Sequence, residues 1–251
     1  MTQQTLTRLR NLKLTGMADA VQQQLEHAST YEGLPFIERL SLLVEHEQLS
    51  REQRKQARLV KQARLKLQAT VQEVDYQSAR NLERSQVANL AQGEWLRRGQ
   101  NLLITGPCGC GKTYLACALG YQACQQGHST RYYRLPRLLL ELSQAKVDGS
   151  YARLLGQLAR IELLILDDWG LEAVNAEQRN ALLEIMDDRY GKYSTVVVSQ
   201  LPTEEWYASL GDNTLADAIL DRLMHNAHRL SLKGESMRKR RSELTQSEHS
   251  S

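Results

Sequence analysis

The chain has 251 residues, of which 41% are apolar, so it can form a hydrophobic core in one large domain or in two of ordinary size. No apolar run approaches the roughly 18 residues of a membrane helix, and the polar start, Met1-Thr2-Gln3-Gln4, lacks the apolar stretch of a signal peptide. The net charge is only +3, but the charges are unevenly distributed. Residues 1–100 contain 15 basic and 11 acidic residues, whereas residues 101–230 contain 12 basic and 15 acidic residues. We therefore expect a cytoplasmic protein with basic flanks, an acidic core and no membrane partner.

The first third of the chain predicts helices. Residues 5–28 and 35 to about 70 show helical periodicity, and Gly33 and Pro35 indicate a turn between the two segments. We therefore expect a small helical domain over residues 1–75. The polar residues 76–100 that follow predict a linker.

The second helical segment contains a basic run. Seven residues between Arg51 and Lys66 are basic and one is acidic. At roughly 100° per residue, five of the cations share one helix face: Arg51, Arg54, Lys55, Arg58 and Lys61. Such a basic ridge fits the phosphates of duplex DNA without base contacts, which favours binding that is independent of sequence. A solvated face, an anionic lipid surface and a partner protein are the alternatives.

A glycine-rich loop follows the linker. Residues 106–113 fit Gly-x-x-x-x-Gly-Lys-Thr, after an apolar run at 101–105 and before a segment rich in Ala and Leu. Glycines allow successive backbone N–H groups to turn toward a phosphate, and the helix N-terminus adds its positive dipole end. Lys112 would reach the β- and γ-phosphates of ATP, and Thr113 would bind Mg²⁺. The predicted nucleotide-binding residues are Gly106, Pro107, Cys108, Gly109, Cys110, Gly111, Lys112, Thr113 and Tyr114.

From residue 101 onward the pattern alternates between strand and helix. We expect strands near 101–105, 130–134, 162–167 and 194–199, with helical stretches between them. A further helical pattern occurs at 215–224. This alternation predicts a parallel, doubly wound sheet.

Two adjacent carboxylates end one of these strands. Asp167 and Asp168 follow a run of Leu and Ile, about 50 residues after the glycine-rich loop. A phosphate-loop fold has its Mg²⁺-holding acid at this position, so Asp167 is expected beside the metal that Thr113 binds. Asp168 would orient or deprotonate the attacking water, with a helix N-cap or loop residue as the alternative.

The later polar residues have two interpretations each. Ser199 and Gln200 end an apolar strand, where they would either face the γ-phosphate or cap the strand. Arg222 and Arg238 are candidate cations for the transition state of phosphoryl transfer. For Arg222, a surface pair with an aspartate is equally compatible with the sequence.

Taken together, these motifs resemble the IstB/DnaC-like branch of AAA+ ATPases, and IstB proteins most closely. The residues that carry the resemblance are Gly-x-x-x-x-Gly-Lys-Thr, Asp167-Asp168-Trp169-Gly170, Asp187-Asp188-Arg189-Tyr190, Ser199-Gln200-Leu201-Pro202, Asp221-Arg222-Leu223 and the opening Leu12-Lys13-Leu14-Thr15-Gly16-Met17-Ala18. The resemblance implies an α/β fold, an AAA+ P-loop parallel sheet flanked by helices, without a helical lid, plus a small N-terminal all-α domain. It would assign residues 101–241 to the ATPase domain. The remaining residues, 242–251, are polar and contain Ser and Glu, a composition that predicts a disordered tail.

The resemblance also implies residue roles. Lys112 and Thr113 match Walker A, Asp167 and Asp168 match Walker B, and Ser199 and Gln200 match the sensor 1 region. Arg222 matches an arginine finger that acts on a neighbouring subunit, and Arg238 matches sensor 2. In this branch two helices after the second strand face DNA, and residues 136–147 and 150–158 look like that pair. Lys146 and Arg153 flank the turn between them and would contact phosphates, with solvated residues as the alternative.

The function implied by the resemblance is ATP hydrolysis that controls assembly on DNA. We expect an ATP- and Mg²⁺-dependent homo-oligomer, with ATP at subunit interfaces, that binds and remodels target duplex DNA and recruits or stimulates a transposase. A DnaC-like helicase loader is the nearest alternative. A small-molecule P-loop kinase and an architectural DNA binder that uses ATP only as a structural ligand are the others.

Overall fold

A computed structural model describes residues 2–76, 80–211, 213–234, 236 and 237. The chain divides into two compact units, Met1–Arg58 and Leu59–Ser251, and the division falls within the long helix α4 (Phe36–Ala63). The sequence pattern instead predicts that the helical domain ends near residue 75. The difference arises because Leu59, Ala69 and Val74 are buried in cores of the second unit. The predicted tail at 242–251 lies outside the described residues.

The first unit is helical, as the sequence predicts. It contains α1 (Thr2–Asn11), α2 (Thr15–Glu26), α3 (Ala28–Tyr31) and the first part of α4. Helices α2 and α4 approach closely at Gly16, where an added Cβ would lie 2.7 Å from the Cβ of Ser50. Beside this contact, the buried carboxylate of Glu47 accepts hydrogen bonds from the Met17 amide at 3.0 Å and from Arg51 at 2.6 Å. Burial would raise the pKa of Glu47, but these hydrogen bonds and the positive charges of Arg51 and Arg54 together lower it below its usual value.

The second unit is built on a parallel sheet of five strands in the order β2-β3-β4-β1-β5. The strands are β1 (Asn101–Thr105), β2 (Thr130–Arg134), β3 (Leu163–Trp169), β4 (Ser194–Ser199) and β5 (Ala227–Ser231). The first four confirm the predicted strands and the parallel, helix-flanked fold. Strand β5 was not predicted.

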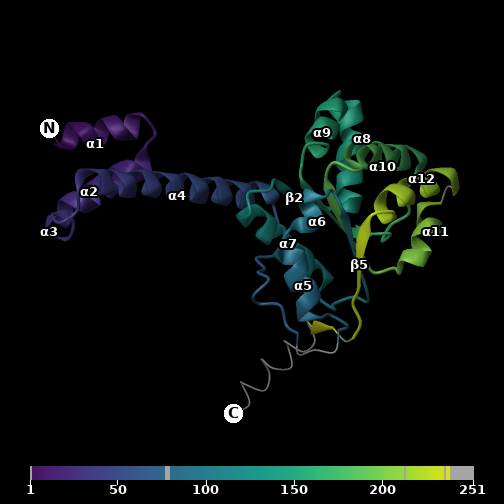
Figure 1. Ribbon diagram of the computed structural model, residues 1–251. Helices are drawn as coiled ribbons and strands as arrows, with labels where there is room; N and C mark the ends of the chain where they lie inside the picture. Colours follow the sequence, from purple (N-terminus) through teal and green to yellow (C-terminus); the bar gives the residue numbers. More distant parts are fainter. Residues whose placement is uncertain (1, 77–79, 212, 235, 238–251) are drawn as a thin grey trace, which may run out of the picture. The chain divides into compact units, whose positions relative to one another are not determined.

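Helices cover both faces of this sheet (Figure 1). Alternate residues of the central strands enter different cores, because successive side chains of a strand point to opposite faces. Leu102 and Ile104 of β1 face the core that contains α7, whereas Leu103 faces the core formed with the helices from α8 onward. The helices are α5 (Arg84–Ala91), α6 (Glu94–Arg97), α7 (Lys112–Gln125), α8 (Leu135–Val147), α9 (Tyr151–Leu158), α10 (Ala176–Arg189), α11 (Trp206–Leu210) and α12 (Asn213–Met224), with a 3-10 turn at Thr203–Glu205.

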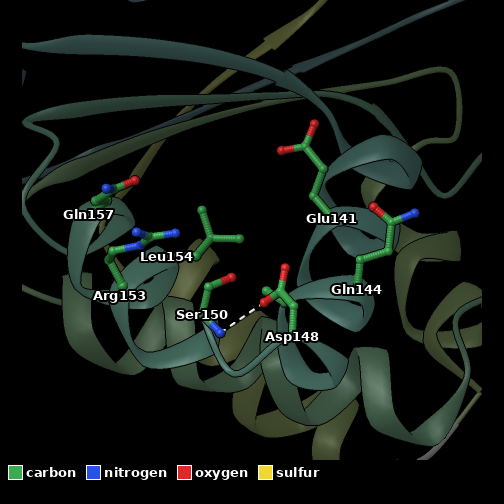
Figure 2. A pocket seen from close by; sticks show the side chains of 8 residues that line it. Glu141, Gln144, Asp148, Ser150, Arg153, Leu154 and Gln157 are labelled. Atoms are coloured by element: carbon green, nitrogen blue, oxygen red, sulfur yellow. Dashed lines mark hydrogen bonds between the residues drawn. The ribbon is translucent and has the colours of Figure 1, made fainter.

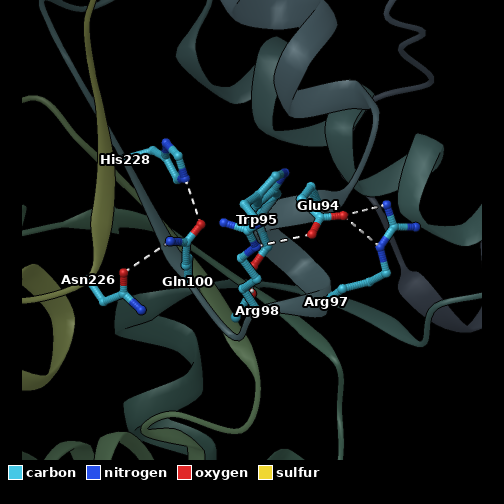
Figure 3. A network of polar contacts seen from close by, with 8 residues as sticks. Glu94, Trp95, Arg97, Arg98, Gln100, Asn226 and His228 are labelled. Carbon is cyan, nitrogen blue, oxygen red and sulfur yellow. Dashed lines mark hydrogen bonds and ion pairs between the residues drawn. The ribbon is translucent and has the colours of Figure 1, made fainter.

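Strand β5 lies at the edge of the sheet and has a polar sequence. Of its five residues, Leu230 is the one that is buried, so the strand lacks the apolar run on which the sequence prediction depended. Side chains also fix its register beside β1. Gln100 donates to Asn226 at 3.1 Å and its carbonyl oxygen lies 2.9 Å from the His228 ring nitrogen (Figure 3).

The segment predicted as a linker is folded. Helices α5 and α6 lie within residues 76–100, and Val87, Leu90 and Trp95 belong to the core on the α7 side of the sheet. Both helices are short, at eight and four residues, so neither shows a long helical pattern in the sequence. Residues 80–100 are therefore part of the second unit.

Beyond β5, the described residues 232–234, 236 and 237 hold no separate helical domain. Within the described part of the chain, no helix is both long enough and apolar enough to cross a membrane.

Asn101 connects three elements at the start of β1. Its side-chain amide donates to the carbonyl oxygens of Arg222 and Leu223 on α12, each at 3.1 Å, and its carbonyl oxygen accepts from the Thr195 amide of β4 at 2.8 Å. The side chain thus holds the amino ends of β1 and β4 and the end of α12 together.

Asn101→Ala is expected to lower the free energy of unfolding of the second unit by about 2–4 kcal/mol, because two buried groups would lose partners at roughly 1–3 kcal/mol each and a third, partly buried group would lose less. Urea denaturation followed by tryptophan fluorescence measures this unit, since the three tryptophans, Trp95, Trp169 and Trp206, are buried within it. The control is Gln100→Ala, whose hydrogen bonds are exposed and whose loss should cost less than about 1 kcal/mol. Equal losses for the two variants would contradict the role of Asn101.

Candidate nucleotide-binding and catalytic site

The glycine-rich loop joins the carboxyl end of β1 to the first residue of α7. Gly106 has φ 143° and Gly111 has φ 95°, conformations that side-chain-bearing residues rarely adopt. A Cβ at Gly106 would lie 2.3 Å from the carbonyl oxygen of Leu232, so the loop also packs too closely for any larger residue. Lys112 begins α7, and its buried ammonium donates to the carbonyl oxygens of Gly106 at 2.6 Å and Pro107 at 2.8 Å. The loop therefore curves around its own lysine at a helix N-terminus.

Asp167 lies at the carboxyl end of β3 and is 2% exposed. Its Oδ2 atom accepts hydrogen bonds from the hydroxyls of Thr113 at 3.0 Å and Tyr132 at 2.6 Å. The ammonium of Lys66 lies 3.7 Å from the same oxygen. Burial and the negative charge of Asp167 raise the pKa of Tyr132, so its hydroxyl remains a donor. The predicted pair of Thr113 and Asp167 is therefore in direct contact.

A β-bulge interrupts the pairing of β3 with β4 at Asp167 and Asp168. Leu166 pairs with Val197 and Trp169 pairs with Ser199, so β3 has one residue more than β4 between these two positions. Asp168 has φ 64°, a left-handed conformation that is uncommon outside glycine and often occurs at functional sites. Its carboxylate accepts from the Nε of Arg134 at 2.5 Å, and this ion pair raises the pKa of Arg134. The bulge thus lets both carboxylates face the same edge of the sheet.

A cavity of about 70 Å³ brings together three of the predicted catalytic residues, Lys112, Asp168 and Ser199. Its lining includes Cys108, Gly109, Lys112, Thr113, Asp167, Asp168, Ser199 and Gln200, together with Lys66 and Val198. Ser199 is fully buried, donates to the Trp169 carbonyl at 2.8 Å and accepts from the Leu201 amide at 3.0 Å. Its hydroxyl is thus engaged by backbone groups, as the strand-capping alternative expects. The side chain of Gln200 is exposed.

A second cavity, of about 300 Å³, shares Gly109, Lys112 and Thr113 with the first. Tyr114 also lines it and donates to Glu73 at 3.1 Å. Arg80 is buried against the loop, where it donates to the carbonyl oxygens of Cys110, at 3.2 Å, and of Asp75, while its Nε has no partner among the described atoms. A volume of this size lies at the lower limit of small-molecule sites. The glycine-rich loop therefore separates a polar cavity at the carboxylates from a larger one on its other side.

Comparison with known proteins now assigns the chain to a family. Residues 7–245 match the family model described as IstB-like ATP binding protein. This chain belongs to that family. The IstB-like chain is 48% identical to the insertion sequence ATP-binding protein y4pL of Sinorhizobium fredii, with 94% of this chain and 96% of the relative aligned. It is 36% identical to the IS21 ATP-binding protein of Pseudomonas aeruginosa, over 92% of this chain and 86% of the relative.

Solved structures confirm the fold of this IstB-like chain. The DnaI crystal structure aligns with a TM-score of 0.57 at 22% identity, over 66% of this chain and 91% of that one. The crystal structure of the DnaC helicase loader also aligns with a TM-score of 0.57, at 20% identity, over 66% of this chain and 97% of that one. The shared architecture is the AAA+ fold, so the predicted fold class and family are both confirmed.

The residues of the IstB-like site fit ATP and a magnesium ion. Mg²⁺ prefers oxygen ligands and is commonly held by one or two protein groups plus phosphates, and Thr113 and Asp167 supply a hydroxyl and a carboxylate. Lys112 and the N-terminus of α7 supply positive charge for phosphates beside them. Sequence reasoning missed Lys66, Arg80, Tyr132 and Arg134, which also contact this site. Of these four residues, Tyr132 is the one that the sequence could have indicated. It lies at an inward-facing position of β2, and a buried hydroxyl needs a hydrogen-bond partner.

Arg222 does not line either cavity at the glycine-rich loop. Its Nε forms an ion pair with Asp187, and it lines a separate hollow together with Arg189 and Asn226. The backbone of Arg222 contacts Asn101 at the amino end of β1, whereas the loop follows the carboxyl end. With about 3.3 Å per residue, a five-residue strand separates these ends by roughly 13 Å. The other predicted arginine, Arg238, lies outside the described residues.

The predicted helix pair after β2 is confirmed as α8 and α9, and a polar hollow lies between them (Figure 2). Arg153 on α9 lines this hollow, as do Glu141 and Asp148 on the α8 side. Lys146 forms an ion pair with Glu177 at 3.2 Å and lies over the ring of Tyr151. Both predicted phosphate contacts therefore have carboxylates in their surroundings.

The five residues of the basic ridge lie on the continuous helix α4, and all are exposed. Arg51 and Arg54 both form ion pairs with Glu47, at 2.6 and 3.5 Å. For Lys55, Arg58 and Lys61, no carboxylate lies within salt-bridge distance among the residues that the structure describes. These three cations are thus the strongest candidates for contacts with an anionic partner.

Proposed function

We propose that this chain is a DNA-binding AAA+ ATPase that hydrolyses ATP to ADP and phosphate and serves DNA transposition. The observation that carries the proposal is the convergence of Lys112, Thr113, Asp167 and Asp168 on one cavity. The full set of nucleotide-binding residues that we propose is the one predicted from the sequence. The printed names of the relatives, which are insertion sequence ATP-binding proteins, support the role in transposition. The likeness to the DnaC helicase loader, at 20% identity, supports the fold alone, so transposition is favoured over helicase loading.

In the proposed reaction each residue has a separate task. Lys112 and the α7 N-terminus bind and neutralise phosphate oxygens, and Thr113 and Asp167 hold Mg²⁺, which stabilises the charge that develops on the transferring phosphoryl group. Asp168 orients the attacking water and accepts its proton. Arg134 forms an ion pair with Asp168 and orients its carboxylate until the attacking water binds. Gln200 or Ser199 responds to the terminal phosphate, and Gln200 is the better candidate because its side chain is exposed.

Arg222 acts, in this proposal, on the nucleotide of a neighbouring subunit. Support comes from its contact with the amino end of β1, opposite the edge that carries the loop. A finger of this kind requires a head-to-tail interface, in which one subunit presents its loop and the next presents its arginine. ATP would then favour the assembled state on DNA, and hydrolysis would dismantle it after a transposase has been recruited.

DNA binding is proposed for the basic ridge of Arg51, Arg54, Lys55, Arg58 and Lys61, with Lys146 and Arg153 as further contacts. The exposed cations without carboxylate partners favour this role. Contacts to phosphates alone give binding that depends on salt and not on base sequence. The assembled protein would therefore bind and remodel many target duplexes.

Stimulation by DNA tests the proposed activity. ATP turnover is expected to rise at least about tenfold with duplex DNA, and particle mass should grow when ATP and DNA are both present. Asp168→Asn should lower kcat by roughly 10²–10⁴ and retain ATP binding, because it removes the group that accepts the proton. Asp217→Asn, which changes an exposed carboxylate of α12, is the control. A monomer that is indifferent to DNA, or full turnover by Asp168→Asn, would refute the proposal.

Mixing two inactive variants tests the shared site. Arg222→Ala is expected to lose at least about 100-fold in DNA-stimulated turnover, given that such fingers contribute about 10³–10⁵ in GTPases. In a 1:1 mixture with Asp168→Asn, an interface is active when the subunit that binds the nucleotide has an intact Asp168 and its neighbour has an intact Arg222. About a quarter of the interfaces meet this condition, so activity should partly recover. Arg160→Ala should behave as the unmodified chain. Wild-type turnover by Arg222→Ala alone, or no recovery on mixing, would show that Arg222 has no role in trans.

The salt dependence of DNA binding tests the basic ridge. The double variant Arg58→Gln with Lys61→Gln is expected to reduce the slope of log Kd against log salt by about 1.8, because each phosphate contact contributes about 0.9. Fluorescence anisotropy with two unrelated duplexes measures the slope, and both duplexes should give the same change. Arg160→Gln with Lys192→Gln removes the same charge at exposed positions outside the ridge. If this control reduced the slope equally, the ridge would not be the contact surface.

A further inference from the structure

Lys66 reaches the ATP site from a segment with no known motif. Helix α4 ends at Ala63, and Arg64 takes a left-handed conformation with φ 51° that redirects the chain. Leu65 then packs against the core on the α7 side of the sheet. Burial raises the pKa of the Cys117 thiol on α7, and hydrogen bonds from the backbone amides of Leu67 and Lys66 oppose that rise. The backbone of Lys66 is therefore fixed against α7, the helix that begins with Lys112.

The side chain of Lys66 has greater freedom than its backbone. It is 39% exposed, its ammonium lies 3.7 Å from the Oδ2 of Asp167, and it lines the 70 Å³ cavity. The ammonium of Lys112, in contrast, is buried between two loop carbonyls. The cavity thus has one enclosed cation and one cation on a long, accessible stem. A lysine side chain of this kind can exchange one anionic partner for another within reach.

The partner of Lys66 must change when a metal–nucleotide complex binds. Oδ2 of Asp167 contacts the ammonium of Lys66 and accepts a hydrogen bond from the hydroxyl of Thr113. A divalent ion held by Asp167 and Thr113 would therefore use this oxygen. A divalent ion and an ammonium repel each other at one carboxylate oxygen. The terminal phosphate of a triphosphate is a strong alternative acceptor within the same cavity, whereas a diphosphate offers no such group.

We propose that Lys66 is a second phosphate-binding cation, which leaves Asp167 for the terminal phosphate when Mg–ATP binds and returns to Asp167 with ADP. The proposal rests on the proposed ATP-dependent function and deepens it. Lys66 would favour ATP over ADP in two ways, because it binds the terminal phosphate and because it competes with Mg²⁺ for Asp167 when that phosphate is missing. It would act within its own subunit, unlike Arg222.

Nucleotide affinities of the full chain test this proposal without turnover. A non-hydrolysable ATP analogue and ADP are titrated with Mg²⁺ by calorimetry for the wild type, Lys66→Gln, Lys66→Met and Lys66→Arg. The Gln and Met variants are expected to reduce the ratio of analogue to ADP affinity about tenfold, since a charge-assisted contact is lost for the analogue alone. Half-saturation of ADP binding by Mg²⁺ should move to a lower concentration. Lys66→Arg should retain the wild-type ratio, and Lys192→Gln, an exposed lysine outside the site, should change neither quantity.

The outcomes separate this inference from the proposed function. An unchanged ratio in both Gln and Met variants, or an equal loss for the analogue and ADP, would overturn the role of Lys66. If the wild type bound neither nucleotide, the proposed function itself would fail. Tryptophan fluorescence of each variant verifies folding, and if both neutral variants were unfolded, an Arg variant that lost the analogue preference would still refute the inference.

Discussion

One buried carboxylate oxygen determines how the ATP site is built. Placing the charge of Asp167 in the interior is costly unless donors compensate it. Those donors come from three separate parts of the chain: Thr113 from α7, Tyr132 from β2 and Lys66 from the segment after α4. Each segment must be correctly positioned for the carboxylate to be satisfied. The stability of the second unit and the geometry of the proposed metal site therefore depend on the same atom.

The two edges of the sheet have different roles. At the carboxyl ends of the strands, the glycine-rich loop, the bulge of β3 and the end of β4 surround the cavity. At the amino ends, Asn101 joins β1 and β4 to α12, which carries Arg222. The separation follows from the parallel topology, since every strand of a parallel sheet ends at the same edge. In the proposed function, a subunit would thus bind its own nucleotide at one edge and supply a cation to another subunit's site from near the opposite edge.

Residues in contiguous motifs were predictable from the sequence, whereas residues that depend on distant partners were not. The loop around Lys112 and the strand that ends at Asp167 follow from local pattern alone, because glycine conformations and apolar runs are local properties. Strand β5 was missed because an edge strand with one buried residue has no apolar pattern. Lys66 was assigned to a basic run, and its true partner, Asp167, is about 100 residues away in the sequence. Ser199 was predicted either to face the γ-phosphate or to cap β4; it lines the cavity, and its hydrogen bonds to backbone groups needed the structure.

The strand order also has a consequence for how the protein is made. Strand β1 carries the glycine-rich loop and β3 carries Asp167, yet the two do not pair, because β4 lies between them. In a growing polypeptide on the ribosome, no sheet can join β1 to β3 until residue 199 has been added, since β4 ends there. Until then, the parts of the ATP site have no common support. Non-local pairing of this kind is slow to form and leaves strand edges open to aggregation. A nascent chain that stops before β4 would thus be a target for chaperones and unable to hold nucleotide.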